Sequence, residues 1–295
     1  MAEGAELRLR AAGTEATFLP DLGMVGTSLR VDGEELLALP GGLAGYGGGH
    51  VTGLPLLAPW ANRLGQRRYE IAGVKVDLTD VDLHDDGQGL PIHGTMTAQP
   101  GWEIVDRTSS SARVRFDYGT RADLLRAFPF PHELVLDIDV ADGLLRVATT
   151  VRPTRDRPLP VSFGWHPYLA LHGSRTDTRV RLPECRHLVL DSRGLPTGDT
   201  EAQLERSELL GDRSFDDGYA LGEDRRLAVE GGPGSITVDL GDGYPYAQVY
   251  SPADATFACL EPMTAPTNAL VTGAARLVEP GGAFSAEFTI TLTRG

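Results

Sequence analysis

The stretch Val161-Ser162-Phe163-Gly164-Trp165-His166-Pro167-Tyr168-Leu169 is typical of a β-strand that ends at a proline. With the two-residue period of a strand, alternate side chains fall on opposite faces: Val161, Phe163 and Trp165 on one, and Ser162, Gly164 and His166 on the other. The first face is apolar, so we expect it to join the core. On the second face, two small residues leave space beside the imidazole.

His166 is expected to emerge where this strand ends. Pro167 has no N–H to donate to a sheet and biases the preceding residue towards an extended conformation, so the strand should stop or bend there. An isolated histidine in such a place is more often satisfied by its neighbours than chemically active. The rest of the sequence has to decide between these two interpretations.

The composition favours a β-rich protein. The chain of 295 residues contains 36 glycines and 20 prolines, which favours many short strands over long helices. Apolar and polar residues alternate in segments such as 112–118, 134–140 and 235–240, and Asp32-Gly33 and Ala72-Gly73 mark hairpin turns. We therefore predict an all-β fold, a large antiparallel β-sandwich or barrel that forms one domain over residues 1–295. Helices should be few and short, with 121–127 as the clear candidate.

The charge balance excludes some partners. Lys and Arg total 27 against 41 Asp and Glu, a net charge of -14, so we expect no nucleic acid and no anionic membrane as a partner. The same field disfavours a highly phosphorylated substrate. The start of the chain lacks the apolar region of a signal peptide, and no apolar run approaches a membrane span, which predicts a soluble, cytoplasmic protein. Cys185 and Cys259 are expected to be buried thiols.

A second candidate strand places a carboxylate among apolar side chains. Residues 257–261 put Glu261 on the same face as Phe257 and Cys259, and Pro262 follows at once. A carboxylate in an apolar row costs free energy unless it is paired, so Glu261 should have a partner or a function. The alternative is a glutamate on an edge strand that reaches solvent.

Other polar segments are interpreted as structural. The glycine-rich segment 41–49 lacks the chemistry of a phosphate-binding loop, so a flexible or close-packed loop is expected. The acidic segment 80–86 misses the spacing of a calcium-binding loop and reads as a solvated acidic turn. Asp216-Asp217-Gly218, taken alone, is typical of a turn. No motif asks for a metal or an organic cofactor, so none is expected.

Short motifs recur in a defined order along the chain: Asn62-Arg63, His93-Gly94, His166, Asp216 three residues before Tyr219, and Glu261. Each is weak by itself, but with this order and spacing the chain resembles the aldose 1-epimerase (galactose mutarotase) family over nearly its whole length. The resemblance implies a supersandwich of antiparallel strands with a sugar-binding cleft. It also implies interconversion of the α and β anomers of a free aldose such as glucose or galactose.

The resemblance implies catalytic roles for three residues. Glu261 would be the base that removes the proton from the C1 hydroxyl, and His166 the acid that protonates the ring oxygen. His93 would assist at that oxygen or hold the sugar.

Further residues would bind the sugar. The resemblance implies that Arg63, within the Asn62-Arg63 motif, and Asp216 hydrogen-bond its hydroxyls. Trp60 or Tyr168 would supply an apolar platform for a sugar face. Trp165 is an equal candidate for that platform and for core packing.

The residue types suit this chemistry. Opening a hemiacetal needs a proton taken from one oxygen and given to another, and each positioned transfer contributes about 10²–10⁴-fold. Histidine suits the acid role because its unperturbed pKa is about 6.5. Glu261 must be ionised to act as a base, and a nearby Arg63 or protonated histidine would favour that form.

Alternatives remain open at this stage. A hexose-phosphate 1-epimerase is weakened because the arginine expected four residues after the first histidine is replaced by Thr97. A non-catalytic carbohydrate-binding or sugar-sensing sandwich would need neither His166 nor Glu261. A glycosidase is disfavoured, because that chemistry ordinarily needs two carboxylates at a fixed separation and the sequence offers one convincing candidate, Glu261. The preferred sugar stays open, as does the oligomeric state, a monomer or a weak dimer.

Overall fold

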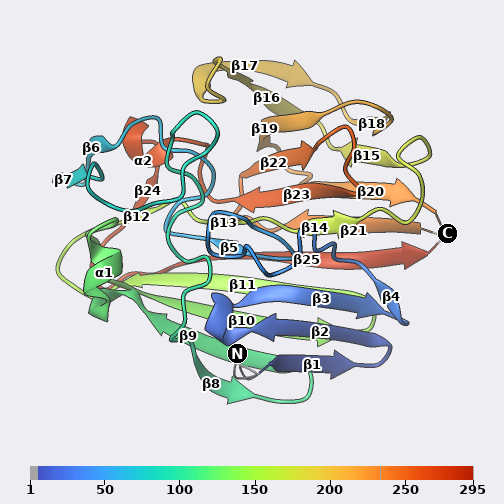
Figure 1. The fold of residues 1–295 in the computed structure, drawn as a ribbon, viewed down its shortest axis with the longest axis horizontal. Helices are drawn as coiled ribbons and strands as arrows, with labels where there is room; N and C mark the ends of the chain where they lie inside the picture. Colours follow the sequence, from blue (N-terminus) through green and yellow to red (C-terminus); the bar gives the residue numbers. More distant parts are fainter. Residues whose placement is uncertain (1–5, 233, 295) are drawn as a thin grey trace.

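The computed structural model describes residues 6–232 and 234–294 and is built almost entirely from antiparallel sheets (Figure 1). The largest sheet has nine strands in the order β18-β15-β20-β21-β25-β11-β10-β9-β8. Their bounds are β8 (Glu103–Arg107), β9 (Ser111–Asp117), β10 (His132–Ala141), β11 (Leu144–Pro153), β15 (Arg179–Leu182), β18 (Arg206–Leu209), β20 (Arg226–Gly231), β21 (Gly234–Leu240) and β25 (Phe284–Arg294).

A second large sheet carries the order β17-β16-β19-β22-β23-β13-β5, and β14 also pairs with β23. Its strands are β5 (Leu56–Leu57), β13 (Gly164–Trp165), β14 (Tyr168–Ala170), β16 (Cys185–Leu190), β17 (Pro196–Gln203), β19 (Phe215–Leu221), β22 (Tyr246–Ser251) and β23 (Phe257–Met263).

Smaller sheets and short helices complete the described residues. A four-stranded sheet holds β1 (Leu7–Ala11), β2 (Thr14–Leu19), β3 (Val25–Val31) and β4 (Glu34–Glu35). Two hairpin-sized sheets pair β6 (Arg68–Ile71) with β7 (Val74–Asp77), and β12 (Leu159–Val161) with β24 (Arg276–Val278). The helices are α1 (Ala122–Leu125), α2 (Ala269–Thr272) and the 3₁₀ turns η1 (Pro20–Leu22) and η2 (Tyr118–Thr120). The predicted all-β sandwich class is confirmed.

One face of the nine-stranded sheet supplies much of the core. In register across the sheet, Ile138 lies opposite Val147, Val147 opposite Phe288, and Phe288 opposite Leu240, all of them buried. The alternation predicted from the sequence therefore holds. In Figure 1, β1 and β2 lie over β10, and β23 lies beside β20; the contacts of β1 and β2 with β10 and of β20 with β23 agree.

Apolar side chains of these sheets form one large cluster that runs from Leu7 to Ile290. That continuity supports our prediction of a single domain, which stays a prediction. Within the described residues, no helix has both the length and the apolar character needed to cross a membrane.

Local turn chemistry was predicted well. Asp32-Gly33 joins β3 to β4, and Ala72-Gly73 joins β6 to β7, with all four residues at positive φ. The helix α1 lies inside the predicted range 121–127. Cys185 and Cys259 are free and buried, as expected.

The stretch 161–169 is not one strand with a hollow face, and that prediction was wrong. Every residue from 161 to 169 is buried, and the chain bends between β12, which pairs with β24, and β13, which pairs with β5 and β23. At the bend, the carbonyl of Phe163 accepts hydrogen bonds from both the N–H and the hydroxyl of Thr264 (3.0 and 2.8 Å). The second interruption consists of His166 and Pro167, between β13 and β14, where Pro167 predicted a stop or bend.

The segment Asp216-Asp217-Gly218 is also not a turn. It lies inside β19, between β16 and β22. Strands β17, β18 and β24 and helix α2 were not predicted. β17 illustrates the reason: as an edge strand it is largely exposed on both faces, so its sequence shows no apolar alternation.

Candidate active site

A cavity of about 170 Å³ lies on one face of the eight-stranded sheet, beneath loops of the first hundred residues. It brings together seven of the eight predicted site residues with four others: Asn62, Arg63, His93, His166, Tyr168, Asp216 and Glu261, joined by Val51, Ile92, Gln248 and Tyr250.

Strand register explains how the sheet contributes to this cavity. Asp216 on β19 lies opposite Tyr250 on β22, and Gln248 on β22 lies opposite Glu261 on β23. Because these partners share a face of the sheet, their side chains point to the same side. Tyr168 on β14 lies opposite Cys259, two residues from Glu261, and so joins the same face.

His166 and Glu261 form the centre of the cavity. The Nε2 atom of His166 lies 3.3 Å from Oε1 of Glu261, and only 6% and 2% of their side chains are exposed. β23 has neighbours on both sides, so Glu261 is not on an edge strand and does not reach solvent. It also lies within the strand, since β23 continues to Met263.

Burial opposes the charged form of both groups. It raises the pKa of the Glu261 carboxyl well above its usual range; the negative charge of Asp216 adds to this rise, and Arg63 opposes it. Burial lowers the pKa of His166 to about 3. We had expected Arg63 to hold Glu261 ionised; it acts in that direction, but burial outweighs it. The pair therefore carries one proton over a wide pH range.

Aromatic rings fix the imidazole of His166. Tyr168 stacks on it, with ring centroids 4.5 Å apart and planes at 11°, while His93 meets it edge-on at 5.5 Å. Tyr250 approaches edge-on at 6.0 Å. Nδ1 of His166 and Nδ1 of His93 are buried and have no hydrogen-bond partner within residues 6–232 and 234–294, which leaves both nitrogens for a ligand.

His93 reaches the cavity through a strained loop. It adopts φ 65°, and its N–H donates to the carbonyl of Asn62 at 3.0 Å. A Cβ atom on Gly94 would lie 2.2 Å from the carbonyl oxygen of Ala58, so only glycine fits there. Burial, and then the nearby charges of His166, Arg63 and His84, lower the pKa of His93 well below its usual value.

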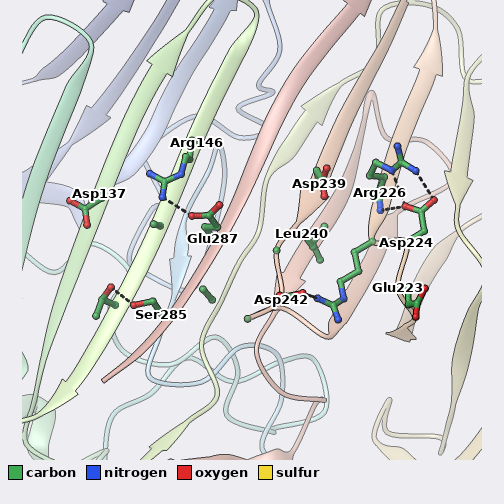
Figure 2. Close-up of a pocket in the computed structure, with 16 residues that line it drawn as sticks. Asp137, Arg146, Glu223, Asp224, Arg226, Asp239, Leu240, Asp242, Ser285 and Glu287 are labelled. Atoms are coloured by element: carbon green, nitrogen blue, oxygen red, sulfur yellow. Dashed lines mark hydrogen bonds and ion pairs between the residues drawn. The ribbon is translucent and has the colours of Figure 1, made fainter. Parts of the chain in front are cut away.

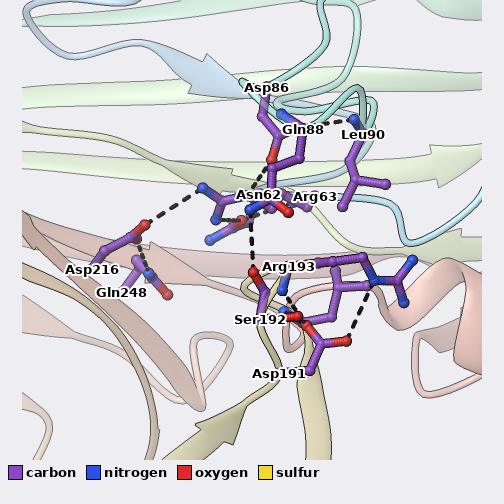
Figure 3. A network of polar contacts seen from close by, with 11 residues as sticks. Asn62, Arg63, Asp86, Gln88, Leu90, Asp191, Ser192, Arg193, Asp216 and Gln248 are labelled. Atoms are coloured by element: carbon purple, nitrogen blue, oxygen red, sulfur yellow. Dashed lines mark hydrogen bonds and ion pairs between the residues drawn. The ribbon is translucent and has the colours of Figure 1, made fainter.

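Arg63 is held by a polar network around its guanidinium (Figure 3). Nε donates to Asp86 at 2.7 Å, Nη1 to Oδ1 of Asn62 at 3.1 Å, and Nη2 to Asp216 at 3.5 Å. Asp216 in turn accepts a hydrogen bond of 2.7 Å from the amide of Gln248. Figure 3 shows the guanidinium between Asp86 and Asp216.

Asp86 belongs to this network although the sequence analysis did not single it out, and the same is true of Gln248. The segment around Asp86 was predicted to be a solvated acidic turn, but the Asp86 side chain is only 8% exposed. Although burial raises its pKa, hydrogen bonds from the N–H of Leu90 and from Arg63 bring the net pKa below the usual value. No local signal in the sequence marks this contact, because Asp86 and Arg63 are 23 residues apart.

Trp60 does not line the cavity, so its predicted role as a sugar platform is corrected. It is fully buried in the main apolar cluster, and its backbone bridges to Ser162. Trp165 is also fully buried, and its Nε1–H donates to the hydroxyl of Thr149 at 3.0 Å. Of the three aromatic candidates, Tyr168 alone lines the cavity.

A larger groove of about 850 Å³ lies on the outer face of the nine-stranded sheet (Figure 2). Its arginines are paired with carboxylates, as in Arg146 with Glu287 and Arg226 with Asp224. In the part of the chain that the structure describes, its lining holds no histidine and no buried carboxylate, so it differs in chemistry from the smaller cavity. Within the described ranges, no three His, Cys, Asp or Glu side chains are grouped to hold a metal ion.

The sequence matches the family model of aldose 1-epimerase over residues 6–291. The chain belongs to the aldose 1-epimerase family. The resemblance read from the ordered motifs is thereby confirmed, and membership indicates an epimerase or mutarotase role acting on a sugar.

Solved structures agree with this membership in fold. A galactose mutarotase-like protein from Clostridium acetobutylicum superposes with a TM-score of 0.86 at 19% identity, covering 98% of this chain and 95% of that one. The galactose 1-epimerase of Lactobacillus acidophilus NCFM superposes with a TM-score of 0.74 at 14% identity, covering 98% of this chain and 94% of that one. An aldose epimerase homologue from C. elegans superposes with a TM-score of 0.77 at 16% identity, covering 98% of this chain and 99% of that one. At these identities the likeness establishes the fold alone. A search of curated proteins found no match.

Replacing Glu261 with Gln should stabilise this epimerase-family chain at alkaline pH. The folded-state pKa of Glu261 is raised above its ordinary value of 4.5, so the stabilising contribution of the protonated carboxyl is present below pH 4.5 and is lost as pH rises through the folded pKa. At pH values above both the unfolded-state and the folded-state pKa, each unit by which folding raises the pKa lowers the free energy of unfolding by about 1.4 kcal/mol. Gln stays neutral throughout.

Urea unfolding at pH 5 and pH 9 measures this effect. Relative to the unaltered chain, Glu261→Gln should unfold at a higher urea concentration at pH 9 than it does at pH 5. Glu70→Gln, on the exposed face of β6, is the matched control and should change little at either pH. If Glu261→Gln were less stable than the unaltered chain by the same amount at pH 5 and pH 9, the raised pKa of Glu261 would be contradicted.

Proposed function

We propose that the protein is an aldose 1-epimerase (mutarotase) that interconverts the α and β anomers of a free aldose such as glucose or galactose. The observation that carries this proposal is the 3.3 Å contact between His166 and Glu261, both of them buried, in the wall of the cavity. A pair that carries one proton supplies one acid and one base, which is what opening a hemiacetal requires.

In the proposed mechanism, Glu261 takes the proton from the C1 hydroxyl and His166 gives a proton to the ring oxygen. The bond between C1 and the ring oxygen breaks, leaving an open-chain aldehyde. Rotation about C1–C2 presents the other face of the carbonyl, and both transfers reverse as the ring closes. The pair ends with the same proton count, so no other reactant is consumed.

Burial by the protein alone places the single proton on Glu261, because it disfavours both charges. The proposed roles therefore require that proton to cross the 3.3 Å contact to His166 when the sugar binds. Sugar hydroxyls and Arg63 favour the ionised carboxylate, which reduces the cost of this step.

The remaining polar groups fit a sugar ring. We assign Arg63, Asn62, Asp216 and Gln248 to its hydroxyls, and the unpartnered Nδ1 of His93 to the ring oxygen or a neighbouring hydroxyl. The volume of about 170 Å³ is below the range of roughly 300–1,000 Å³ for drug-sized ligands, which suits a monosaccharide unit. Tyr168 and Tyr250 supply the apolar walls.

The alternatives are less well supported. Among residues 6–232 and 234–294, Arg63 is the one cation in the cavity lining, and Asp86 and Asp216 already engage it, which disfavours a phosphosugar at this position. A non-catalytic sugar-binding protein would not need two buried titratable groups in contact, since these cost free energy without improving recognition.

Polarimetry of freshly dissolved α-D-glucose and α-D-galactose tests the proposal. The protein should speed the approach to the final rotation. Glu261→Gln and His166→Asn should each lower the acceleration by at least about 10², because each removes one proton-transfer group. Glu70→Gln serves as the control. Near-normal rates in both site variants would refute these roles, and no acceleration of any aldose would refute the function.

The pH dependence of the acceleration should also be distinctive. Below the pKa of His166, at about 3, both groups are protonated and the base is lost. Above the raised pKa of Glu261 both are deprotonated and the acid is lost. The acid limb of kcat/KM should therefore fall well below pH 6.5, the usual value for histidine. An acid limb centred near 6.5, with circular dichroism unchanged, would contradict this prediction.

Asp86 should matter for sugar binding through Arg63. Asp86→Ala removes the buried partner of Nε and leaves the guanidinium less well oriented, so KM should rise about tenfold while kcat changes less. Asp85→Ala is the matched control, because Asp85 pairs with Arg67 and does not line the cavity. Equal effects of the two substitutions would show that Asp86 has no special role.

A further inference from the structure

The loop of residues 191–195, which joins β16 to β17, lies against the polar network of Arg63. Figure 3 shows Ser192 and Arg193 of this loop beside Asn62 and Arg63. Within residues 6–232 and 234–294, the loop contributes no side chain to the wall of the cavity around the catalytic pair. The proposed reaction therefore gives it no role, although it packs on a side chain that does line that wall.

Gly194 of this loop lies over the guanidinium of Arg63. A Cβ atom on Gly194 would be 3.3 Å from Nη1, 3.5 Å from Cζ and 3.7 Å from Nε of that side chain. Distances this similar to three atoms of a planar group place the Cβ position over the face of the plane. The edge of the plane is taken by Asp86, Asn62 and Asp216, which accept hydrogen bonds from Nε, Nη1 and Nη2. The guanidinium is thus held at its edge by hydrogen bonds and on one face by Gly194.

The conformation of the loop requires glycine at this position. Gly194 adopts φ 72°, in the left-handed region that residues with a Cβ atom rarely enter. Its N–H donates to the carbonyl of Asp191 at 3.0 Å. The carboxylate of Asp191 accepts hydrogen bonds from the N–H groups of Arg193 and Leu195, at 2.8 and 3.0 Å. Asp191 therefore folds the turn that brings Gly194 onto the arginine.

The loop is anchored to the segment that carries Arg63. Leu195 is 3% exposed, and its Cδ1 atom lies 2.9 Å from the position of a Cβ atom on Gly65. Nη1 of Arg193 donates to the carbonyl of Gly65 at 3.4 Å. Because Gly65 follows Arg63 by two residues, these contacts tie the loop to the arginine's own segment.

The loop also contacts the segment that carries Asp86. Nε2 of Gln88 donates to the carbonyl of Ser192 at 3.4 Å. The N–H of Gln88 donates to Oδ1 of Asp86 at 2.8 Å. The loop is thereby joined to both members of the ion pair between Arg63 and Asp86.

We propose that Gly194 is a positioning residue, through which the loop of residues 191–195 holds the guanidinium of Arg63 in the orientation that binds sugar hydroxyls. A guanidinium is a rigid planar fork, so its hydrogen bonds depend on the tilt of the plane. The three acceptors at its edge take three of its five N–H groups, which leaves one on Nη1 and one on Nη2 for a ligand. This inference rests on the proposed function, since it takes the ligand to be a sugar.

A comparison of Gly194→Asn with Gly198→Asn, by polarimetry of α-D-glucose and α-D-galactose, tests the proposal. Asparagine tolerates positive φ, so both variants should fold. The added Cβ atom at position 194 presses on Nη1 and tilts the guanidinium, so KM should rise about tenfold while kcat changes less than about twofold. Gly198 is the matched control. It has φ 99°, no atom of the described residues lies within 4 Å of its Cβ position, and its KM should be unchanged.

A double-mutant cycle shows whether Gly194 acts through Arg63. Lysine keeps the positive charge but has no planar fork to orient. In the Arg63→Lys background, Gly194→Asn should therefore change KM less than about twofold. An equal rise of KM in both backgrounds would show that Gly194 acts on another part of the site and would overturn the proposal.

Asp191→Ala tests the turn without adding bulk beside Arg63. Loss of the two accepted hydrogen bonds loosens the turn, so KM should rise about three- to tenfold with kcat little changed. Asp191→Asn keeps a side-chain oxygen as acceptor and should restore most of the unaltered KM. An unchanged KM in Asp191→Ala overturns the role of the turn, and an unchanged KM in Gly194→Asn overturns the role of Gly194.

Calorimetric titration with the same two sugars separates this proposal from the function on which it rests. In each variant Kd should change in parallel with KM. If the unaltered chain binds an aldose without accelerating its mutarotation, the proposed function fails, and the Kd values of Gly194→Asn and Gly198→Asn decide the positioning role. If the unaltered chain accelerates mutarotation and Gly194→Asn lowers kcat with KM unchanged, the function stands and the positioning role is overturned. A chain that neither binds nor accelerates any aldose overturns both.

Discussion

The contact between His166 and Glu261 depends on keeping water away from two titratable side chains. Both lose solvation when they are buried, and each would be costly alone. A shared proton lets the pair stay neutral, and placing Glu261 inside β23, with strands on both sides, prevents it from escaping to solvent. The surrounding core must be rigid enough to hold this arrangement, and the stacked ring of Tyr168 adds to that rigidity.

The site is built by joining a regular and an irregular part of the chain. The eight-stranded sheet supplies Asp216, Gln248 and Glu261 in register, at positions set by strand pairing. Loops of the first hundred residues supply Arg63 and His93, at positions set by turns with positive φ and by hydrogen bonds such as that of His93 to Asn62. A rigid scaffold with loops laid over it suits a site in which proton-transfer groups stay fixed while ligand contacts vary.

The electrostatics of the candidate active site favour neutral ligands. Although the chain carries a net charge of -14, the candidate site contains Arg63, whose charge is balanced by Asp86 and Asp216. Hydrogen bonds from a fixed guanidinium orient hydroxyls without the strong attraction for anions that a free arginine would exert.

The sequence alone determined the fold class, the hairpin turns, the buried cysteines and most of the polar residues that line the candidate cavity, because these follow from local periodicity, from turn chemistry or from ordered motifs. It identified Glu261 as a carboxylate in need of a partner, since a strand period of two places it in an apolar row. Only the tertiary structure decided the rest. Asp216 lies in a strand because β16 and β22 flank it, Trp60 packs into the core, and Asp86 reaches Arg63 across 23 residues. Contacts between segments distant in sequence leave no local signal, and desolvation, which sets the protonation of His166 and Glu261, exists only once the chain has folded around them.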